Sequence, residues 1–184
     1  MNFHELILIG LLFQFFDINI VGIDIIPDFV GFIIMVYAFS KRKVRYAKLG
    51  MYFSVILSIA SFIEMWQQTT SFYESTNLWA QIIVIVISSF NILYFACIFY
   101  VSKEILKMDN GIFPKLFIGL QLFLHLLNTF AMHFPGYELG FVSIVIMLIL
   151  LVLYIYFVVF LWKRKNIEKE MYEEIVPSNL YDSQ

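Results

Sequence analysis

The sequence has few charged residues and a single cysteine, and both shortages exclude classes of protein. Charged residues make up 14% of the 184 residues, against about a quarter in soluble domains. Cys97 is the only cysteine, so the chain forms no internal disulfide and no cysteine-based metal site. The sequence also lacks a G-x-S-x-G nucleophile motif, an H-E-x-x-H zinc motif and a glycine-rich phosphate loop. These absences favour a protein that is not an enzyme and that uses no cofactor, metal or nucleic acid.

Hydrophobic residues fill the place of the missing charges, at 61% of the chain and a mean hydropathy of +0.85. The 12 basic residues fall into three short clusters separated by apolar runs. Alternate gaps between these runs carry no Lys or Arg, as the positive-inside rule predicts for a multi-pass membrane protein. The clusters are Lys41, Arg42, Lys43, Arg45 and Lys48; Lys103, Lys107 and Lys115; and Lys163, Arg164, Lys165 and Lys169.

The apolar runs predict six membrane spans, each near the length of about 17–25 residues that crosses a bilayer. We place them at residues 3–21, 24–40, 47–66, 79–102, 115–134 and 139–162. The expected fold is an all-α, polytopic membrane bundle with six transmembrane helices and both termini in the cytoplasm. The polar loop 67–78 contains no basic residue and is expected outside the cell, and membrane lipids are the expected surroundings.

Two features of this topology leave alternatives open. The first two runs are short, so they could instead form a re-entrant hairpin that leaves four full spans. At the other end, we divide the chain into a transmembrane domain at 1–165 and a polar cytoplasmic tail at 166–184. The tail is expected to be amphipathic or disordered, because Pro177 and Asn179 oppose a helix that continues to the end.

Acidic residues crowd the connection between the first two runs. Asp17 shares a helical face with Gly10 and Gln14, while Asp24 and Asp28 flank the start of the second span. One interpretation makes Asp17, Asp24 and Asp28 an acidic, outward-facing mouth that attracts a cation or proton. The other places Asp17 among lipid headgroups and makes Asp24 the N-cap of the second span, with Asp28 in its first turn.

A second polar stripe lies within the fifth span. Gln121, His125 and Asn128 are spaced four and three residues apart, so they share one helical face. The stripe could line a polar pathway or bind a ligand. Alternatively, it could join helices by hydrogen bonds, with Asn91 of the fourth span as a partner.

Small residues mark the third span as a packing surface. Gly50, Ser54, Ser58 and Ser61 recur nearly every four positions. Such a stripe allows another helix to approach closely and needs no catalytic explanation.

The segment from Gly22 to Phe32 carries a resemblance to a known family. It contains Ile-Asp-Ile-Ile-Pro-Asp-Phe-Val-Gly-Phe from Ile23 onward. This resembles a segment of small, uncharacterised multi-pass membrane proteins of Gram-positive bacteria. The resemblance covers about the first 45 residues and implies a bacterial cytoplasmic membrane location without adding any chemistry.

A second likeness is to the substrate-binding membrane subunits of energy-coupling-factor vitamin transporters, which also have six helices. This sequence lacks their Ala-x-x-x-Ala docking signature. The likeness therefore supplies only an alternative hypothesis.

The leading functional hypothesis is a non-enzymatic membrane protein that works as an accessory, immunity or regulatory component, with a protein partner or as a homo-oligomer. The alternative is a small transporter or substrate-binding subunit with the acidic mouth described above.

Overall fold

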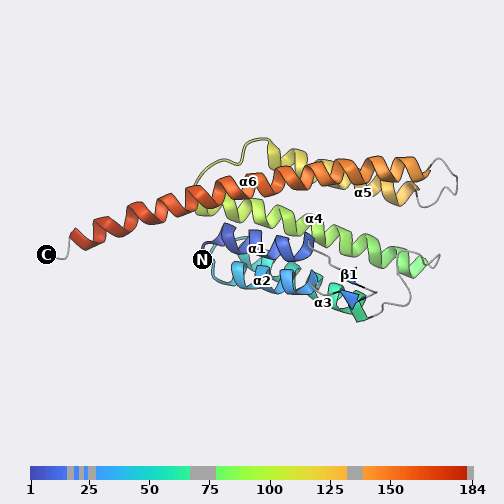
Figure 1. The fold of residues 1–184 in the computed structure, drawn as a ribbon, viewed down its shortest axis with the longest axis horizontal. Coiled ribbons are helices and arrows are strands. Elements are labelled where there is room, and N and C mark those ends of the chain that lie inside the picture. The colour runs from blue at the N-terminus through green and yellow to red at the C-terminus, as the bar shows by residue number, and fades with distance from the viewer. Residues whose placement is uncertain (16–18, 21–22, 25–27, 67–77, 132–138, 182–184) are drawn as a thin grey trace.

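The computed structural model describes residues 1–15, 19–20, 23–24, 28–66, 78–131 and 139–181. Six helices form the body of this part, and they lie side by side along one long axis (Figure 1). Two short strands, β1 (Asn19–Ile20) and β2 (Ile23–Asp24), pair antiparallel between the first two helices. The prediction of a helical fold is thus confirmed. The helices are α1 (Phe3–Phe15), α2 (Asp28–Ser40), α3 (Ala47–Trp66), α4 (Leu78–Leu106), α5 (Phe113–Ala131) and α6 (Leu139–Tyr181).

The helices match the predicted spans well in the middle of the chain and less well at its ends. α3 has the predicted bounds, and α4 and α5 differ from theirs by a few residues. α1 ends at Phe15 because the chain continues into the β1–β2 ladder, and α2 begins only at Asp28. Asp24 lies in β2, four residues before α2, so its predicted role as the N-cap of this helix is wrong.

The last helix is much longer than predicted. α6 runs without a break across residue 165 and ends at Tyr181, so the expectation that Pro177 and Asn179 would prevent a helix there is wrong. Proline lacks an amide donor and its ring crowds the carbonyl four residues earlier, but its own carbonyl still accepts a bond from the next turn. Pro177 lies four residues before the last residue of α6, so the helix continues for about one turn beyond it. In Figure 1 this end of α6 projects beyond the other helices.

α4 lies between the layer formed by α1, α2 and α3 and the pair α5–α6 (Figure 1). An aromatic cluster packs α4 against that pair, and all of its side chains are buried. Phe117 of α5 and Phe157 of α6 lie with ring centroids 5.0 Å apart. Phe95 and Phe99 of α4 each lie 5.2 Å from Phe157. These edge and tilted contacts are the geometries that aromatic rings prefer.

Glycine allows close approach within the layer of α1, α2 and α3. A Cβ atom added to Gly31 of α2 would overlap the carbonyl oxygen of Gly10 of α1. A Cβ atom on Gly50 of α3 would meet the ring of Phe39. The predicted packing surface on α3 is therefore confirmed, and its Ser58 hydroxyl donates to the carbonyl of Phe29 on α2 at 3.2 Å.

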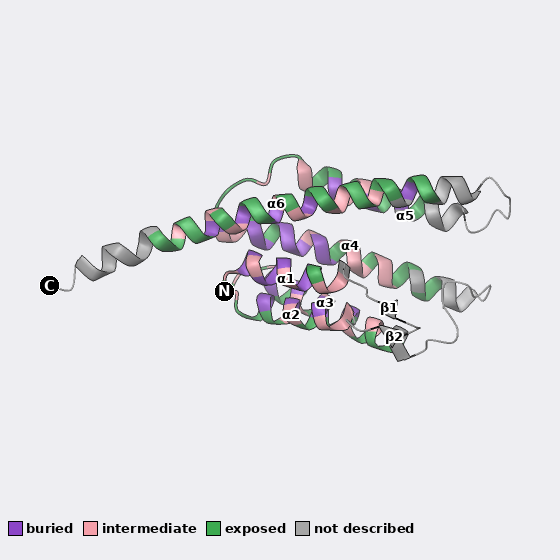
Figure 2. Cartoon of the chain, in the orientation of Figure 1, coloured by how far each residue is buried: buried purple, intermediate pink, exposed green. Residues whose placement is uncertain are grey.

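Exposed residues occur along the outer sides of the helices (Figure 2), and many of them are large apolar side chains. Two helical stretches are long and apolar enough to cross a membrane, Ile85–Leu106 in α4 and Ile144–Glu173 in α6. Shorter apolar stretches occur in the other four helices. Exposed apolar side chains include Ile56, Ile59 and Ile63 on α3, Leu116, Phe123 and Leu126 on α5, and Leu148, Leu151 and Ile155 on α6.

Candidate functional site

Contacts among the three basic clusters place them at one end of the bundle. We call this the cationic end and define it as residues 1–5, 40–48, 102–115 and 162–169. Every pair of clusters is joined by at least one hydrogen bond. The Arg45 amide donates to Glu104 (3.1 Å), the Arg42 guanidinium donates to Glu168 (2.6 Å), and the Arg164 guanidinium donates to the carbonyl of Asp109 (3.0 Å).

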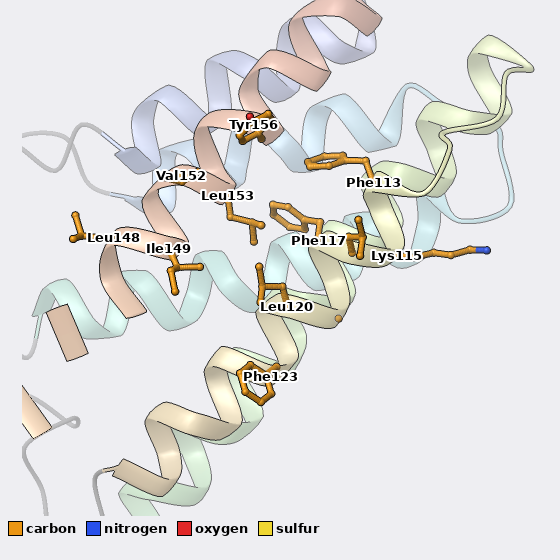
Figure 3. A pocket seen from close by; sticks show the side chains of 12 residues that line it. Phe113, Lys115, Phe117, Leu120, Phe123, Leu148, Ile149, Val152, Leu153 and Tyr156 are labelled. Carbon is orange, nitrogen blue, oxygen red and sulfur yellow. The ribbon is translucent and has the colours of Figure 1, made fainter. Parts of the chain in front are cut away.

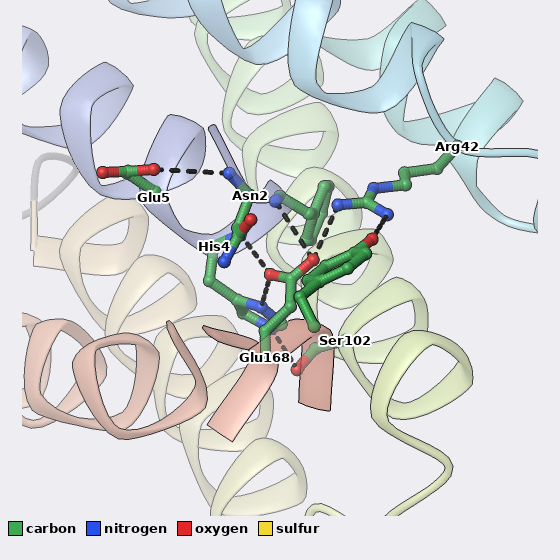
Figure 4. A network of polar contacts seen from close by, with 8 residues as sticks. Asn2, His4, Glu5, Arg42, Ser102 and Glu168 are labelled. Atoms are coloured by element: carbon green, nitrogen blue, oxygen red, sulfur yellow. Dashed lines mark hydrogen bonds and ion pairs between the residues drawn. The ribbon is translucent and has the colours of Figure 1, made fainter. Parts of the chain in front are cut away.

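A buried polar network occupies the centre of the cationic end (Figure 4). His4 and Ser102 have no exposed surface, and Glu168 is 1% exposed. His4 Nδ1 lies 2.7 Å from Glu168 Oε2, and His4 Nε2 lies 2.8 Å from Ser102 Oγ. A neutral imidazole that donates from Nδ1 to the carboxylate and accepts from the hydroxyl at Nε2 gives each ring nitrogen a partner. Three distant segments, α1, α4 and α6, thus meet through one imidazole ring.

Glu168 also caps the N-terminus of α1. Its carboxylate accepts from the backbone amides of Phe3 (3.3 Å) and His4 (3.2 Å). These amides have no partner within α1 because they belong to its first turn, and the negative charge suits the positive end of the helix dipole. The Glu5 carboxylate accepts from the Asn2 amide at 3.3 Å, as in a capping box. A residue of the last helix therefore stabilises the start of the first.

Arg42 balances the charge of Glu168 from the connection between α2 and α3. Its guanidinium also donates to the Tyr172 hydroxyl at 3.0 Å, and it lies 6.0 Å from the centre of the Phe3 ring. A buried carboxylate requires such a partner, since an isolated buried charge is very unfavourable. Arg42 therefore connects the basic cluster after α2 to Glu168 and Tyr172 of α6.

An exposed ion pair lies on the connection between α4 and α5. The Lys103 ammonium and the Asp109 carboxylate are 3.0 Å apart, and the hydrogen bond and charge of Lys103 lower the pKa of Asp109 below its usual value. A lowered folded-state pKa contributes stability above the unfolded pKa, and this contribution is lost as the pH falls through the folded value. Both groups are exposed, so solvent screening keeps the contribution small.

Ser102, His4 and Glu168 have the hydrogen-bond order of a hydrolase triad. A triad also needs access for substrate and donors for the oxyanion. Ser102 and His4 have no exposed surface. Ser102 lies within α4, where the backbone amides are used by the helix itself. The arrangement therefore suits a structural junction better than acyl transfer.

The candidate site residues chosen from the sequence do not form one site in the described part of the chain. Asp17 lies outside the described residues. Asp24 pairs with Asn19 in the β ladder, and Asp28 is the first residue of α2. An acidic mouth at these residues stays a prediction.

Of the polar stripe predicted on α5, the structure describes the side chain of Gln121. Gln121 is buried and shares a hydrogen bond with Tyr154 of α6, so its described partner comes from α6 and not from Asn91 of α4. The side chains of His125 and Asn128 lie outside the described residues. At Gln121 the stripe joins two helices, as the packing interpretation expects.

His4 and Glu168 were missed as site residues in the sequence analysis. They are 164 residues apart in the chain, and no local motif connects them. The only sequence signal is Asn2 with Glu5 three positions later, a pattern typical of a helix start.

No group of three or more His, Cys, Asp or Glu residues in the described ranges is placed to hold a metal ion. Cys97 is a free, buried thiol of α4. Comparison of the chain with models of protein families, with characterised proteins and with solved structures finds no match.

Proposed function

We propose that the chain is a multi-pass integral protein of the bacterial cytoplasmic membrane, and that it works without enzymatic activity as an accessory, immunity or regulatory component. In this proposal six helices lie in the bilayer, the cationic end faces the cytoplasm, and both termini lie on that side. The last turns of α6 then reach into the cytoplasm, where a protein partner could bind them.

The observation that carries the proposal is the position of the three basic clusters at one end of an apolar bundle. Positively charged residues are retained on the cytoplasmic side of a membrane. The sides of α3, α5 and α6 expose many large apolar residues. In water a surface of this kind would far exceed the apolar patches that soluble monomers tolerate. Lipid is therefore the solvent that fits both features.

The polar interior favours a structural over a catalytic role. His4 and Ser102 are completely enclosed and are used to join helices. A fluorophosphonate probe, which reacts with activated serines, is expected to leave Ser102 unlabelled in the membrane-embedded protein. Labelling that disappears in a Ser102→Ala variant would contradict the non-enzymatic role.

The projecting part of α6 supports a role in contacting a partner. Lys169, Glu170 and Glu173 are exposed beyond the contacts made by Glu168. A photo-crosslinking amino acid at Glu170 is expected to give a discrete larger adduct in cells. The same amino acid at Tyr156, an exposed residue of the apolar part of α6, is the matched control. An absence of protein adducts at Glu170, Glu173 and Lys169 would contradict a partner at this segment.

Membrane insertion itself has a direct biochemical test. The chain is expected to stay with the membrane pellet after alkaline carbonate extraction and to be released by detergent. Release by carbonate would overturn the proposal, because only peripheral proteins leave the bilayer under that treatment.

A further inference from the structure

An apolar groove runs between α5 and α6 (Figure 3). Its volume is about 830 Å³, within the range of pockets that hold small molecules. The groove extends along α5 from Phe113 to Phe123, about 15 Å of helix at 1.5 Å per residue. Its walls include Leu116, Leu120 and Phe123 of α5 and Ile149, Val152 and Tyr156 of α6.

Positive charge stands at one end of this groove. Lys115 of α5 belongs to its lining, and its ammonium extends outward, away from the apolar side chains (Figure 3). Lys163 lies seven residues after Tyr156 on α6, so it continues the same helical face by two turns. Both lysines are exposed. The groove therefore combines a hydrocarbon interior with one cation in its lining, Lys115, and a second cation, Lys163, further along α6 toward the cationic end.

We infer that this groove holds an acyl chain of an anionic phospholipid from the leaflet at the cationic end. The chain lies between α5 and α6, and the phosphate contacts Lys115 and Lys163. Basic pockets between helices on the cytoplasmic side are suited to such headgroups. The inference rests on the proposed membrane location and adds a specific lipid site to it.

A second copy of the chain is a less suitable occupant. Copies inserted in the same orientation have their cationic ends at the same depth. A helix of another copy in the groove would bring its own lysines toward Lys115 and Lys163, and like charges repel. An anionic lipid supplies the opposite charge.

Gly119 makes the inference testable without damage to the core. It lies in the groove lining, and a Cβ atom added there meets nothing within 4 Å. A large side chain at this position is therefore expected to enter the groove and take the place of the acyl chain. Leu122 is exposed on the same helix and is not part of the lining, so Leu122→Trp is a matched control.

The experiment uses the full chain in detergent micelles and measures retained lipid by native mass spectrometry. Phosphatidylglycerol and phosphatidylcholine with identical acyl chains are the probes. Gly119→Trp is expected to weaken phosphatidylglycerol binding by about tenfold or more, as the loss of two buried methylenes would. Leu122→Trp is expected to bind as the unaltered chain does. Gly119→Leu serves as a second, smaller block if the tryptophan variant does not fold.

The headgroup has its own pair of variants. Lys115→Gln is expected to reduce the preference for phosphatidylglycerol over phosphatidylcholine by about fivefold, the effect of one lysine near an anionic lipid. Lys107 is an exposed lysine of the cationic end outside the lining, and Lys107→Gln is expected to leave the preference unchanged.

Three results would overturn the inference. They are equal binding of both lipids by the unaltered chain, unchanged binding in both Gly119 variants, and a dimer that Gly119→Trp dissociates. In any of these cases a chain that still requires detergent leaves the membrane proposal intact. A chain that is folded and monodisperse without detergent contradicts the membrane proposal itself.

Discussion

At the scale of single residues, Glu168 accepts bonds from two distant segments at once, α1 and the connection between α2 and α3. Its carboxylate pairs with Arg42, caps the first turn of α1 and accepts from the imidazole of His4. Such a residue cannot be found from local sequence, because its partners lie 126 to 165 positions away. In the sequence, Glu168 lies in the segment 166–184 that was predicted to be a polar tail, and no role was assigned to it. Glu168 joins these segments only because helix packing buries its carboxylate beside them.

Replacing Glu168 with Ala is expected to destabilise the protein by about 3–5 kcal/mol, because Arg42 is left without its charged partner and α1 loses its cap. Thermal unfolding in detergent measures the change. Glu170→Ala on the exposed side of the same helix is the control, with an expected change within about 0.5 kcal/mol. Equal effects of the two substitutions would show that the buried network does not hold α6 in place.

At the scale of helices, periodicity and length predicted most of the elements but not their ends. α3 has the expected bounds because a basic cluster precedes it and a polar loop follows it. The ends of α1 and α2 were misplaced because an apolar sequence suits a strand as well as a helix, and the ladder of Asn19–Ile20 with Ile23–Asp24 replaced the expected helical turns. The continuation of α6 past residue 165 is accompanied by contacts of Glu168 and Tyr172 with Arg42, which composition does not reveal.

The crossing of α1 and α2 depends on glycine. Gly31→Leu is expected to destabilise the protein by about 1–3 kcal/mol or more, because the new side chain would overlap the backbone of Gly10. Gly119→Ala is the control, since it meets no neighbour and improves helix propensity by about 1 kcal/mol. Thermal unfolding in detergent measures the stability of both variants. A Gly31→Leu variant as stable as the control would contradict the close packing of α1 and α2.

The depth of the α1–α2 pair in the membrane separates the two predicted topologies. Each helix has 13 residues, or about 20 Å, which is shorter than a hydrocarbon core of about 30 Å. The predicted six-span topology requires the connection between the two helices to reach the outer side of the membrane. A cysteine at Asp24, in a chain with Cys97→Ser, is expected to react with an impermeant maleimide in intact cells. Protection from the reagent on both sides of the membrane would favour the re-entrant hairpin.

At the scale of the whole molecule, the distribution of positive charge is the feature that sequence predicts best. The three basic clusters were expected on one side, and hydrogen bonds among them place them at one end of the bundle. The interior network at that end could not be predicted, because it depends on how α1, α4 and α6 pack. Sequence thus predicts which surface is polar, and the fold determines which polar groups meet.

The central claim is that the cationic end faces the cytoplasm while lipid surrounds the bundle, and cysteine labelling tests it most directly. Asn110→Cys, on the connection between α4 and α5, is expected to react with an impermeant maleimide only after cells are opened. Ser71→Cys, in the loop predicted to be extracellular, is the control and is expected to react in intact cells. Both variants carry Cys97→Ser. Labelling of Asn110→Cys in intact cells would contradict the account.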